Sequence, residues 1–373
     1  MKTFLEFYNE NGERLKRKIE RFNDELIKED KPLLLPFMKN FADLNEGGKM
    51  LRGTLVNMGY ALTLEPELLG VDMKEDRHLY GESDALALAF EIFQTSVLMH
   101  DDVIDHAALR RGKPTVHTRY RRSLWNRGIE DKAGDTPQSV AICLGDFGLY
   151  AASDVIVKSY AHDPTLSDIL EYFNGVVMDT IRGELLDVIL PYEGADLTRD
   201  QDEREKLVLD SVREVYRLKT AKYSIVGPLH LGLIYGGADE ETLKKVDAFA
   251  ESLGIAFQIK DDIFGVYGGE EIGKDVGSDI EEAKMTILYN FVRAKDERLH
   301  RELMQYYGKS PATADAIAKV QNIFTESGAL EYATTTMEKC FDDAKKAVEE
   351  MDFCKEKKEL LGGLISYMRE RTK

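Results

Sequence analysis

The chain has 373 residues, with 50 basic and 68 acidic side chains and a formal net charge of −18. This acidic balance argues against nucleic-acid binding through a broad basic face. Apolar residues make up 43% and charged residues 32%, which is typical of a chain with a large core rather than of a disordered one. With only 9 prolines and no linker-like tract, we expect a single domain over residues 1–373.

Cysteine usage and the N-terminal sequence bear on location. The three cysteines, Cys143, Cys340 and Cys354, form no CxxC pair and no Cys/His cluster. They predict neither a disulfide framework nor a zinc site, and they favour a reducing, cytoplasmic location. The first twenty residues lack the apolar core of a signal peptide, and no uninterrupted apolar run approaches the ~18 residues of a membrane span. We therefore expect neither export nor a transmembrane segment.

Apolar residues recur at three- and four-residue spacing along most of the chain, which predicts an all-α protein. The segment 83–99 (SDALALAFEIFQTSVLM) is apolar nearly all round, so we expect its helix in the middle of a helical assembly. Asp163-Pro164 and Ser310-Pro311 each match an N-cap followed by proline at the first helical position, and they predict helix starts.

An acidic cluster, HDDVID, follows the 83–99 segment directly. On a helix, Asp101 and Asp105 share one face, and their like charges would repel each other unless a cation lay between them. Carboxylates without histidine or thiolate partners suit a hard ion, above all Mg²⁺. The alternative interpretation is a solvated acidic helix end.

A second acidic pair, Asp261-Asp262, follows another apolar segment, 248–259. If two such helix ends met across a helical bundle, they would make a site for several Mg²⁺ ions and for a diphosphate that bridges them. The alternative for this pair is a helix cap or a loop.

Basic residues stand in short motifs that a diphosphate would need. They are GGKMLR at 47–52, RRGKP at 110–114, Lys219-Thr220, and Gly273-Lys274 with Lys284. Lys49 and Arg52 are three residues apart and share a helical face, and arginine offers a diphosphate bidentate hydrogen bonds. Ordinary surface charge is the alternative for each motif taken alone.

The order GGKxLR, HDDxxD with RRGxPT, KT, FQxxDD and GKxxGxD, over about residues 45–290, resembles that of the trans-type polyprenyl diphosphate synthases. The similarity points to short-chain members that make geranylgeranyl or farnesyl diphosphate. It implies the all-α isoprenoid synthase fold, a large helical bundle around a central cavity. It also implies a homodimer that joins an allylic diphosphate to isopentenyl diphosphate, head to tail.

The resemblance assigns metal ligands residue by residue. Asp101 and Asp105 would hold two Mg²⁺ ions on the allylic diphosphate, with Asp102 in support. Asp261 would hold a third ion, and Asp262 would act beside it.

The same resemblance assigns substrate contacts. Isopentenyl diphosphate would be bound by Lys49, Arg52 and Arg111, with Gln94 where bacterial relatives often have histidine. The allylic diphosphate would be bound by Arg110, Lys219 and Lys274. The position where the cation forms would be lined by Thr220 and Gln258, with Lys219. Lys284 is a further candidate for substrate binding, on its charge alone.

Four residues depart from the family pattern. Met50 and Gly53 replace the usual basic residue and proline, Glu184 stands in the Gly-Gln-x-x-Asp motif, and Gly265 replaces the last acid of the second aspartate motif. None of them removes a primary ligand.

Product length depends on residues that precede Asp101, because the growing tail should extend along that helix toward its start, at about 5.4 Å per turn. Ser96 and Val97 offer no aromatic floor for a fifteen-carbon product. Phe93 lies about one turn further and would stop the tail there. We expect a twenty-carbon product, with fifteen-carbon or longer products as alternatives, and Phe93 as a plain core residue is the competing interpretation.

Two other functions are compatible with parts of the pattern. A class I terpene cyclase would share the fold and the first aspartate motif, but it would not need Lys49, Arg52 or Asp261. A non-catalytic regulatory subunit should have lost metal ligands, whereas Asp101, Asp105 and Asp261 are all present.

Overall fold

The computed structural model describes residues 3–65, 82–129, 134–193, 201–268 and 277–370. Its internal contacts divide the chain into two compact units, each described by itself. Unit 1 comprises Met1–Glu171 with Pro228–Ala238, and unit 2 comprises Tyr172–Gly227 with Asp239–Lys373. Each unit is assembled from segments that are not contiguous in sequence. The expectation of one domain over the whole chain stays a prediction.

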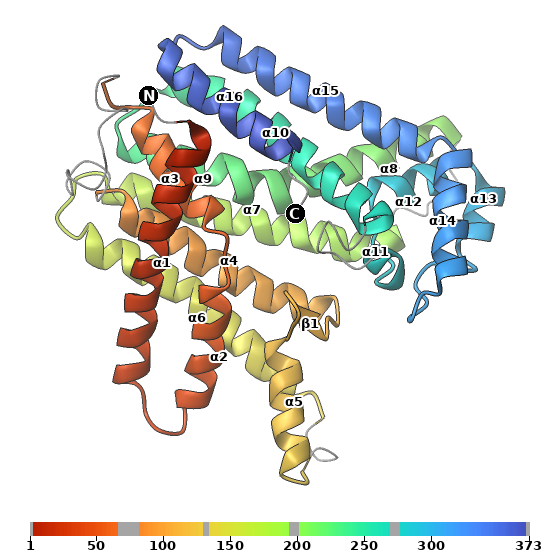
Figure 1. The fold of residues 1–373 in the computed structure, drawn as a ribbon, viewed down its shortest axis with the longest axis horizontal. Coiled ribbons are helices and arrows are strands. Elements are labelled where there is room, and N and C mark those ends of the chain that lie inside the picture. The colour runs from red at the N-terminus through yellow and green to blue at the C-terminus, as the bar shows by residue number, and fades with distance from the viewer. Residues whose placement is uncertain (1–2, 66–81, 130–133, 194–200, 269–276, 371–373) are drawn as a thin grey trace. The chain divides into compact units, whose positions relative to one another are not determined.

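Helices dominate both units, and the only strands in the described ranges form a two-stranded hairpin, so the all-α class is confirmed (Figure 1). Unit 1 contains α1 (Phe4–Glu29), α2 (Leu35–Glu46), α3 (Leu51–Ala61), α4 (Asp84–Ile104), β1 (Leu109–Arg110), β2 (Lys113–Pro114), α5 (Val116–Asn126), α6 (Thr136–Ser159), the first residues of α7 (Leu166–Glu193) and most of α9 (Gly227–Tyr235). Unit 2 contains the rest of α7, α8 (Gln201–Val215), the π-helix η3 (Tyr216–Val226), α10 (Glu240–Tyr267), α11 (Ser278–Glu281), α12 (Ile287–Lys295), α13 (Glu297–Leu303), α14 (Ala314–Glu326), α15 (Ala329–Glu350) and α16 (Lys355–Glu370).

Helix α4 is the central element of unit 1, as its apolar sequence predicts. It begins directly after Ser83 and packs against α3, α6, α1 and α2. Phe90 and Phe93 are fully buried, and their rings meet edge to face with centroids 6.1 Å apart. The helix continues through Ile104, so Asp101 and Asp102 belong to its last turn and Asp105 is its C-cap.

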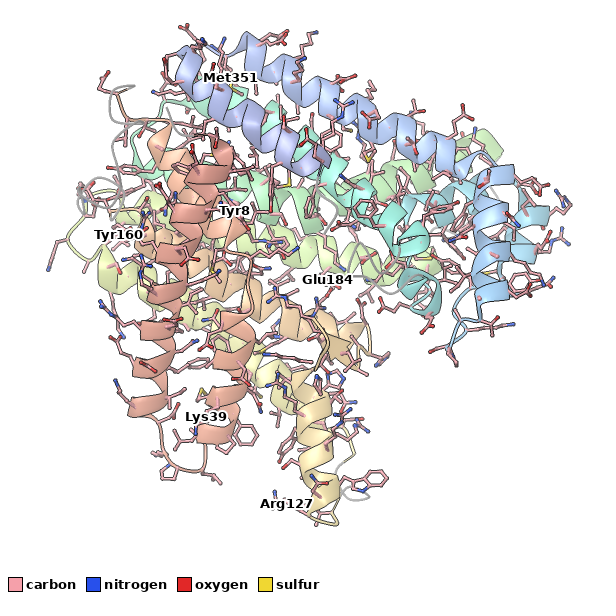
Figure 2. All side chains as sticks on the ribbon, in the orientation of Figure 1. Tyr8, Lys39, Arg127, Tyr160, Glu184 and Met351 are labelled. Atoms are coloured by element: carbon pink, nitrogen blue, oxygen red, sulfur yellow. The ribbon has the colours of Figure 1, made fainter. Side chains whose placement is uncertain are left out.

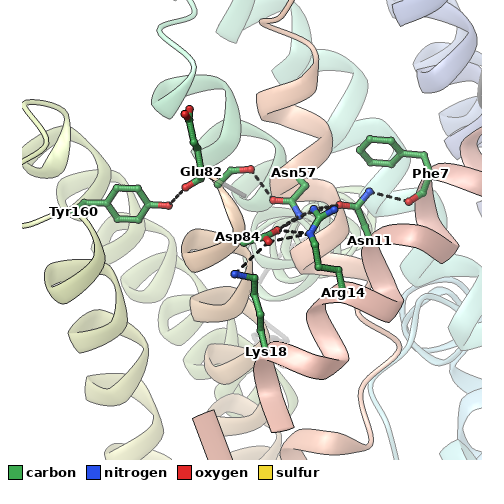
Figure 3. Close-up of polar contacts among 9 residues, drawn as sticks. Phe7, Asn11, Arg14, Lys18, Asn57, Glu82, Asp84 and Tyr160 are labelled. Atoms are coloured by element: carbon green, nitrogen blue, oxygen red, sulfur yellow. Dashed lines mark hydrogen bonds and ion pairs between the residues drawn. The ribbon is translucent and has the colours of Figure 1, made fainter. Parts of the chain in front are cut away.

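A buried polar cluster ties the start of α4 to its neighbours (Figure 3). The Asp84 carboxylate is 1% exposed and accepts hydrogen bonds from Arg14 Nε, at 3.0 and 2.9 Å, and from Arg14 Nη2 at 2.9 Å. Asn57 Nδ2 donates to the same carboxylate at 2.9 Å, and Lys18 Nζ lies 3.3 Å away. Two cations and an amide therefore compensate the buried charge, and they fix α1 and α3 on α4.

Helices α3 and α9 meet backbone to backbone. A Cβ at Gly59 would lie 2.0 Å from the Leu229 carbonyl oxygen, and one at Gly232 would lie 2.0 Å from the Val56 carbonyl oxygen. Only glycine allows this approach, so two residues on facing helices fix the crossing of the pair.

Both proline-based helix starts are displaced in the structure. Helix α7 begins at Leu166, because Asp163 Oδ1 accepts from Thr165 N at 2.9 Å and so closes a local turn first. Helix α14 begins at Ala314, where the Thr313 hydroxyl caps Ala316 N at 3.2 Å, so the prediction at Ser310 is wrong.

In unit 2, α10 packs mainly against α15 and η3. Its apolar side chains, among them Phe249 and Leu253, are fully buried. The expectation that this helix ends before Asp261 is wrong. Helix α10 continues to Tyr267, so Asp261 and Asp262 lie within it, and neither a cap nor a loop describes them.

Helix α6 is the one helix in the described ranges that is long and apolar enough to cross a membrane. Its mean hydropathy reaches 1.7, and one third of that window is buried within the structure. Core helices of proteins outside membranes have the same composition, and α6 packs along α4.

Candidate active site

The first aspartate cluster of unit 1 is held by Arg110, from the hairpin that follows α4. Arg110 Nη2 donates to Asp101 Oδ2 at 2.8 Å, and Arg110 Nε donates a short hydrogen bond to Asp102 Oδ1. The single guanidinium thereby spans two adjacent carboxylates. Such charge-assisted pairs are geometrically specific, so the cluster is fixed before any ligand arrives.

The hairpin owes its shape to the RRGK sequence. Leu109 pairs with Pro114 and Arg110 with Lys113, which leaves Arg111 and Gly112 as a two-residue turn. Both turn residues have positive φ, 53° and 72°, as a type I′ turn requires. Arg110 is thereby directed to the aspartates, while Arg111 lies against Gly47, where a Cβ would meet Arg111 Nη1 at 2.8 Å.

The three aspartates differ in burial. Asp102 is 2% exposed, and burial raises its pKa to about 6, although Arg110 opposes the shift. Asp101 is 19% exposed at its side chain, and Asp105 is half-buried at the C-cap. The side chains of Asp101 and Asp105 are therefore more accessible than that of Asp102.

His100, which precedes the aspartates on α4, contacts α6. Its Nε2 lies 3.2 Å from the Ile142 carbonyl oxygen and 3.2 Å from Asp146 Oδ1, both on α6. A Cβ at Gly145 would lie 2.3 Å from the same ring nitrogen, so the imidazole fills the space that this glycine leaves. The ring fixes the end of α4 on α6.

A cavity of about 190 Å³ lies beside the cluster, within unit 1. Its basic lining is Arg110, Arg111, Lys113 and Arg119, and Asp102 reaches it from α4. Arg119 is itself paired with Asp43 at 2.9 Å. The cavity therefore carries an excess of positive charge next to the aspartates.

The GGK turn precedes α3. Met50 has φ 57°, no side chain caps the helix from that position, and Lys49 leads into the turn. The cap comes from α4 instead: Glu91 Oε1 accepts from Gly53 N at 2.7 Å, and its carboxylate also takes a backbone hydrogen bond from Arg52. Glu91 thus satisfies donors of the α3 N-terminus that would otherwise lack partners.

Glu91 is buried, at 2% exposure, and burial raises its pKa. The Gly53 N–H and the charges of Arg52 and Arg111 oppose that shift. One carboxylate therefore connects the helix that carries Arg52 to the arginine of the hairpin. Lys49 lies before α3, separated from it by the left-handed Met50, so the expectation that Lys49 and Arg52 share a helical face is wrong.

The departure at Gly53 has a physical reason. A Cβ there would lie 2.8 Å from Leu15 Cδ1 and 2.9 Å from the Ala87 carbonyl oxygen. Proline, the usual residue of the family pattern, would also remove the N–H that binds Glu91. Glycine allows both the close packing and the hydrogen bond.

Lys219 lies on η3 in unit 2. Its Nζ is 2.6 Å from Asp187 Oδ2 and 2.9 Å from Glu184 Oε2, both on α7. A Cβ at Gly183 would lie 2.3 Å from Lys219 N, so the two helices touch at this point. The departure at Glu184 therefore gives Lys219 a second carboxylate. π-helical turns are frequent at functional sites, and this one also carries Thr220.

A chain of hydrogen bonds runs from Thr220 to Asp262. Thr220 Oγ1 donates to Gln258 Oε1 at 2.7 Å, and Gln258 Nε2 donates to Asp262 Oδ1 at 2.8 Å. The Tyr216 hydroxyl donates a short hydrogen bond to Asp262 Oδ2. Asp262 is 4% exposed, and burial, reinforced by Asp279, raises its pKa to about 7. Asp262 anchors this network, while Asp261 is less buried.

The departure at Gly265 is also explained. A Cβ at this position would lie 1.9 Å from Asp279 Oδ2, and Asp279 is 2% exposed. The Asp279 carboxylate therefore occupies the space where a side chain of residue 265 would begin. An acidic side chain, that of Asp279 on α11, is therefore present beside position 265 although residue 265 itself is glycine.

The other predicted site residues have separate surroundings. Lys284 Nζ pairs with Glu282 at 2.9 Å, and Gln94 is half-buried on α4. Lys274 lies outside the described residues. Ser96 donates a short hydrogen bond to the Gly145 carbonyl oxygen, and Val97 is half-buried.

The donor chemistry of the first cluster fits a hard divalent cation. Asp101 and Asp105 offer carboxylate oxygens only, one helical turn apart, at the negative end of the α4 dipole. Among the residues that the structure describes, no three His, Cys, Asp or Glu side chains gather into a preformed metal site. A cation held by two aspartates would need oxygens from a further ligand, as Mg²⁺ sites on phosphates do.

Comparisons with known proteins agree with this geometry. The family model described as Polyprenyl synthetase matches residues 36–324. The chain belongs to the polyprenyl synthetase family. A short chain isoprenyl diphosphate synthase of Methanothermobacter thermautotrophicus is 27% identical over 332 residues, 88% of each chain. A geranylgeranyl diphosphate synthase of Sulfolobus acidocaldarius is 28% identical, over 87% of this chain and 86% of that one.

Solved structures of polyprenyl synthetases share the fold. The geranylgeranyl pyrophosphate synthase of Corynebacterium glutamicum, solved in complex with isoprenyl diphosphate and magnesium, superposes with a TM-score of 0.82 over 98% of both chains, at 24% identity. The expected isoprenoid synthase fold is confirmed.

Some members of the site were not predicted from the motifs. Glu91 and Tyr216 contact predicted residues but were not singled out, whereas Asp279 is the last acid of the GKxxGxD motif. Glu91 left a signal, since it is the one acid between Asp84 and Asp101 in an apolar helix. Tyr216 left none, because its partner Asp262 is distant in the sequence.

Proposed function

We propose that this protein is a Mg²⁺-dependent prenyltransferase that condenses isopentenyl diphosphate with allylic diphosphates, head to tail, to a trans-polyprenyl diphosphate. The observation that carries the proposal is the oxygen-only pair Asp101 and Asp105 at the end of α4, with Arg110 bound to Asp101, in a chain of this family. The product proposed is geranylgeranyl diphosphate. Farnesyl and longer diphosphates are the alternatives, and relatives bear names of several lengths, such as the geranylfarnesyl diphosphate synthase of Natronomonas pharaonis.

The metal ligands proposed are Asp101, Asp105 and Asp261, for three Mg²⁺ ions on the allylic diphosphate. Bound there, Mg²⁺ would supply Lewis-acid stabilisation of the negative charge on the departing diphosphate. Arg110, Lys219, Lys274 and Lys284 add fixed positive charge on the same substrate. Ionisation of an allylic carbon–oxygen bond is favoured where such charges are already in place.

Isopentenyl diphosphate is proposed to bind Lys49, Arg52 and Arg111, with Gln94 beside them. Arg52 and Arg111 can each offer a bidentate pair of hydrogen bonds, and Lys49 a point charge. Glu91 positions this group through its contacts with the α3 backbone and its charge next to both arginines. The site therefore binds a diphosphate without metal.

Thr220 and Gln258 are proposed to face the cation that forms after ionisation. Their hydrogen bond of 2.7 Å points the Gln258 oxygen and the Thr220 hydroxyl at each other rather than at a reacting carbon. They can stabilise positive charge by their dipoles without capturing it. The diphosphate just released is the base that takes the last proton, so no catalytic histidine is needed.

A homodimer is proposed from the surface of α6. Ile142, Tyr150 and Val157 are 43%, 78% and 43% exposed, and their spacing of eight and seven residues places them along one face. An apolar stripe of this kind is typical of a surface that a partner covers. The partner proposed is a second copy of the chain, in the cytoplasm.

The function is tested by incubating purified protein with Mg²⁺, labelled isopentenyl diphosphate and each allylic diphosphate in turn, followed by chain-length analysis. We expect Asp101→Ala to lower turnover by at least ~10³-fold, because it removes a ligand of the charge that forms in the transition state. Asp315→Ala, at an exposed acid on α14, is the matched control and should keep full activity.

Three results would contradict the proposal. Conversion of an allylic diphosphate into a hydrocarbon without isopentenyl diphosphate would indicate a class I terpene cyclase. Turnover only on addition of another protein would indicate a regulatory subunit. Full activity in Asp101→Ala would exclude the metal site at the end of α4.

A further inference from the structure

A basic, aromatic surface lies outside the proposed active site, on α5. Residues 113–129 contain five lysine and arginine residues, one tryptophan and no acid, in a chain with a net charge of −18. Thr118, Arg121, Arg122, Trp125 and Asn126 line one shallow hollow on this helix. We refer to these five residues with Arg127 as the α5 face.

The α5 face is one side of a helix. Residues 118, 121, 122 and 125 are separated by three or four positions, so they share a side, while Leu124 is 5% exposed and packs inward. Trp125 is 67% exposed, and Figure 2 labels Arg127 at the end of α5 away from the hairpin. Within the described residues, Arg122 and Arg127 have no acidic side chain within ion-pair distance.

The composition of the α5 face fits an external anionic partner. The Trp125 indole is two-thirds exposed among arginines, so burial in the protein core contributes little to its stability. It has the amphipathic character of side chains found at lipid–water boundaries, where arginine stems lie along apolar surface and their heads meet phosphate. The segment is basic although the whole chain is acidic, so it attracts anions only at short range, within about 8 Å at physiological salt.

We propose that the α5 face docks on an anionic lipid bilayer, with Trp125 at the headgroup level and Arg121, Arg122 and Arg127 on the lipid phosphates. A protein partner fits less well. The helix has 11 residues, a length of about 16 Å, and one face of it offers far less than the roughly 800 Å² per partner that a stable complex buries. A bilayer needs no such complementary area.

This docking would have a consequence that rests on the proposed function. A prenyl diphosphate with an apolar tail would leave the enzyme beside a lipid surface, where its tail is soluble. The docking itself does not depend on turnover, so it can fail or succeed independently of the synthase activity.

The experiment uses the 373-residue chain, whose only tryptophan is Trp125. Its fluorescence therefore reports on the α5 face alone. With vesicles of phosphatidylcholine and 30 mol% phosphatidylglycerol, we expect a blue shift, protection from iodide quenching, and co-sedimentation with the vesicles. Pure phosphatidylcholine vesicles should give none of these, and 1 M NaCl should release the protein, because the Debye length falls to about 3 Å.

Two double variants separate the face from general charge. Arg122→Glu with Arg127→Glu should weaken co-sedimentation at least tenfold. Lys309→Glu with Lys355→Glu changes the net charge equally at exposed sites on other elements, and should leave binding within twofold. Both variants should keep their thermal midpoint, which shows that they are folded. Trp125→Ala should weaken binding while keeping its salt dependence.

Other results would overturn the proposal. An unchanged emission spectrum with anionic vesicles would show that Trp125 meets no lipid. A blue shift that grows with protein concentration and needs no vesicles would assign the α5 face to a second copy of the chain. Equal losses in the two double variants would mean that overall charge, and not this face, governs binding.

Discussion

At the scale of single residues, the negative charge of Glu91 opposes the role proposed for the arginines beside it. A buried carboxylate lies next to Arg52 and Arg111, the groups proposed to bind an anionic substrate. The negative charge of Glu91 weakens the electrostatic attraction between the two arginines and a diphosphate. In return, the Glu91 carboxylate caps α3 and holds the two arginines in place for a substrate. The carboxylate can remain buried because buried charges are stable when they are paired.

The first prediction concerns Glu91→Ala. It removes the hydrogen bond to Gly53 N and the charge between the arginines, so α3 loses its cap. We expect the KM for isopentenyl diphosphate to rise on the order of tenfold, with the KM for the allylic diphosphate unchanged, since a buried hydrogen bond is worth about 1–3 kcal/mol. Glu91→Gln keeps an acceptor and should restore most of the affinity. A loss shared equally by both substrates would contradict the positioning role.

The second prediction is a pH dependence. Burial raises the pKa of Glu91, so its charged form is disfavoured in the folded state relative to the unfolded one. Its contribution to stability is complete below the ordinary carboxyl pKa and is lost as the pH rises through the raised value. The thermal midpoint of the wild type should therefore fall relative to that of Glu91→Gln over this range. Parallel curves for the two proteins would show that the shift is absent.

The residues predicted from sequence and those missed differ in one physical respect. Asp101, Arg110 and Lys219 stand in short motifs, so their chemistry can be predicted from the residues next to them in the sequence. Tyr216 stands in no motif, and its hydrogen bond to Asp262 joins positions 46 residues apart, so nothing in the local sequence predicts it. Whether a carboxylate binds an ion or anchors a network, as Asp262 does, depends on burial, which spacing does not reveal.

At the scale of elements, α4 combines two functions on one helix. Its last turn carries the aspartates, and its middle carries the residues proposed to limit the growing tail. Phe93 lies eight residues before Asp101, about 12 Å along the axis, and is fully buried. The prediction of this helix from sequence succeeded because apolar residues cover all its faces. The end of α10 was mistaken because an acidic pair was taken as a boundary, whereas the helix buries one of the two acids.

The third prediction is that Phe93→Ala lengthens the product. Removing the ring opens space in line with the tail, and chain-length analysis should show at least one further isoprene unit. Phe90→Ala is the matched control, because Phe90 is equally buried one turn earlier on the same helix and its ring meets that of Phe93 edge to face. Each variant should lose about 3–5 kcal/mol of unfolding free energy. If both variants lengthen the product equally, general loosening of the core is the cause and Phe93 is no floor.

The fourth prediction concerns the crossing of α3 and α9. Gly59→Ala places a methyl group 2.0 Å from the Leu229 carbonyl oxygen, so the helices must separate. We expect a loss of about 3 kcal/mol or more, seen as a lower midpoint in urea. Gly175→Ala, on α7, meets nothing within 4 Å and should instead stabilise the protein by about 0.5–1 kcal/mol. Equal effects of the two substitutions would exclude the close crossing.

At the scale of the whole molecule, an acidic chain carries, within its described ranges, one helix that is apolar enough for a membrane. Helix α6 is one-third buried over its most apolar window, and Tyr150 at its middle is 78% exposed. A charged surface with one apolar stripe favours a defined dimer over precipitation. A second copy covers the stripe, and the net negative charge of each dimer then repels other dimers. The same acidity makes the basic α5 face distinct, so the two surfaces should act independently.

The fifth prediction tests that association. Tyr150→Glu places a charge in the centre of the α6 stripe, where a second copy would have to bury it, so we expect the mass measured by light scattering to fall from that of two chains to the monomer's 42.3 kDa. Leu33→Glu alters an equally exposed apolar residue, 82% accessible, between α1 and α2, and should leave the dimer intact. A dimer that survives Tyr150→Glu would place the interface elsewhere. A wild type that is monomeric at micromolar concentration would contradict the dimer. The α6 stripe would then be a candidate for contact with the lipid bilayer that the α5 face is proposed to bind.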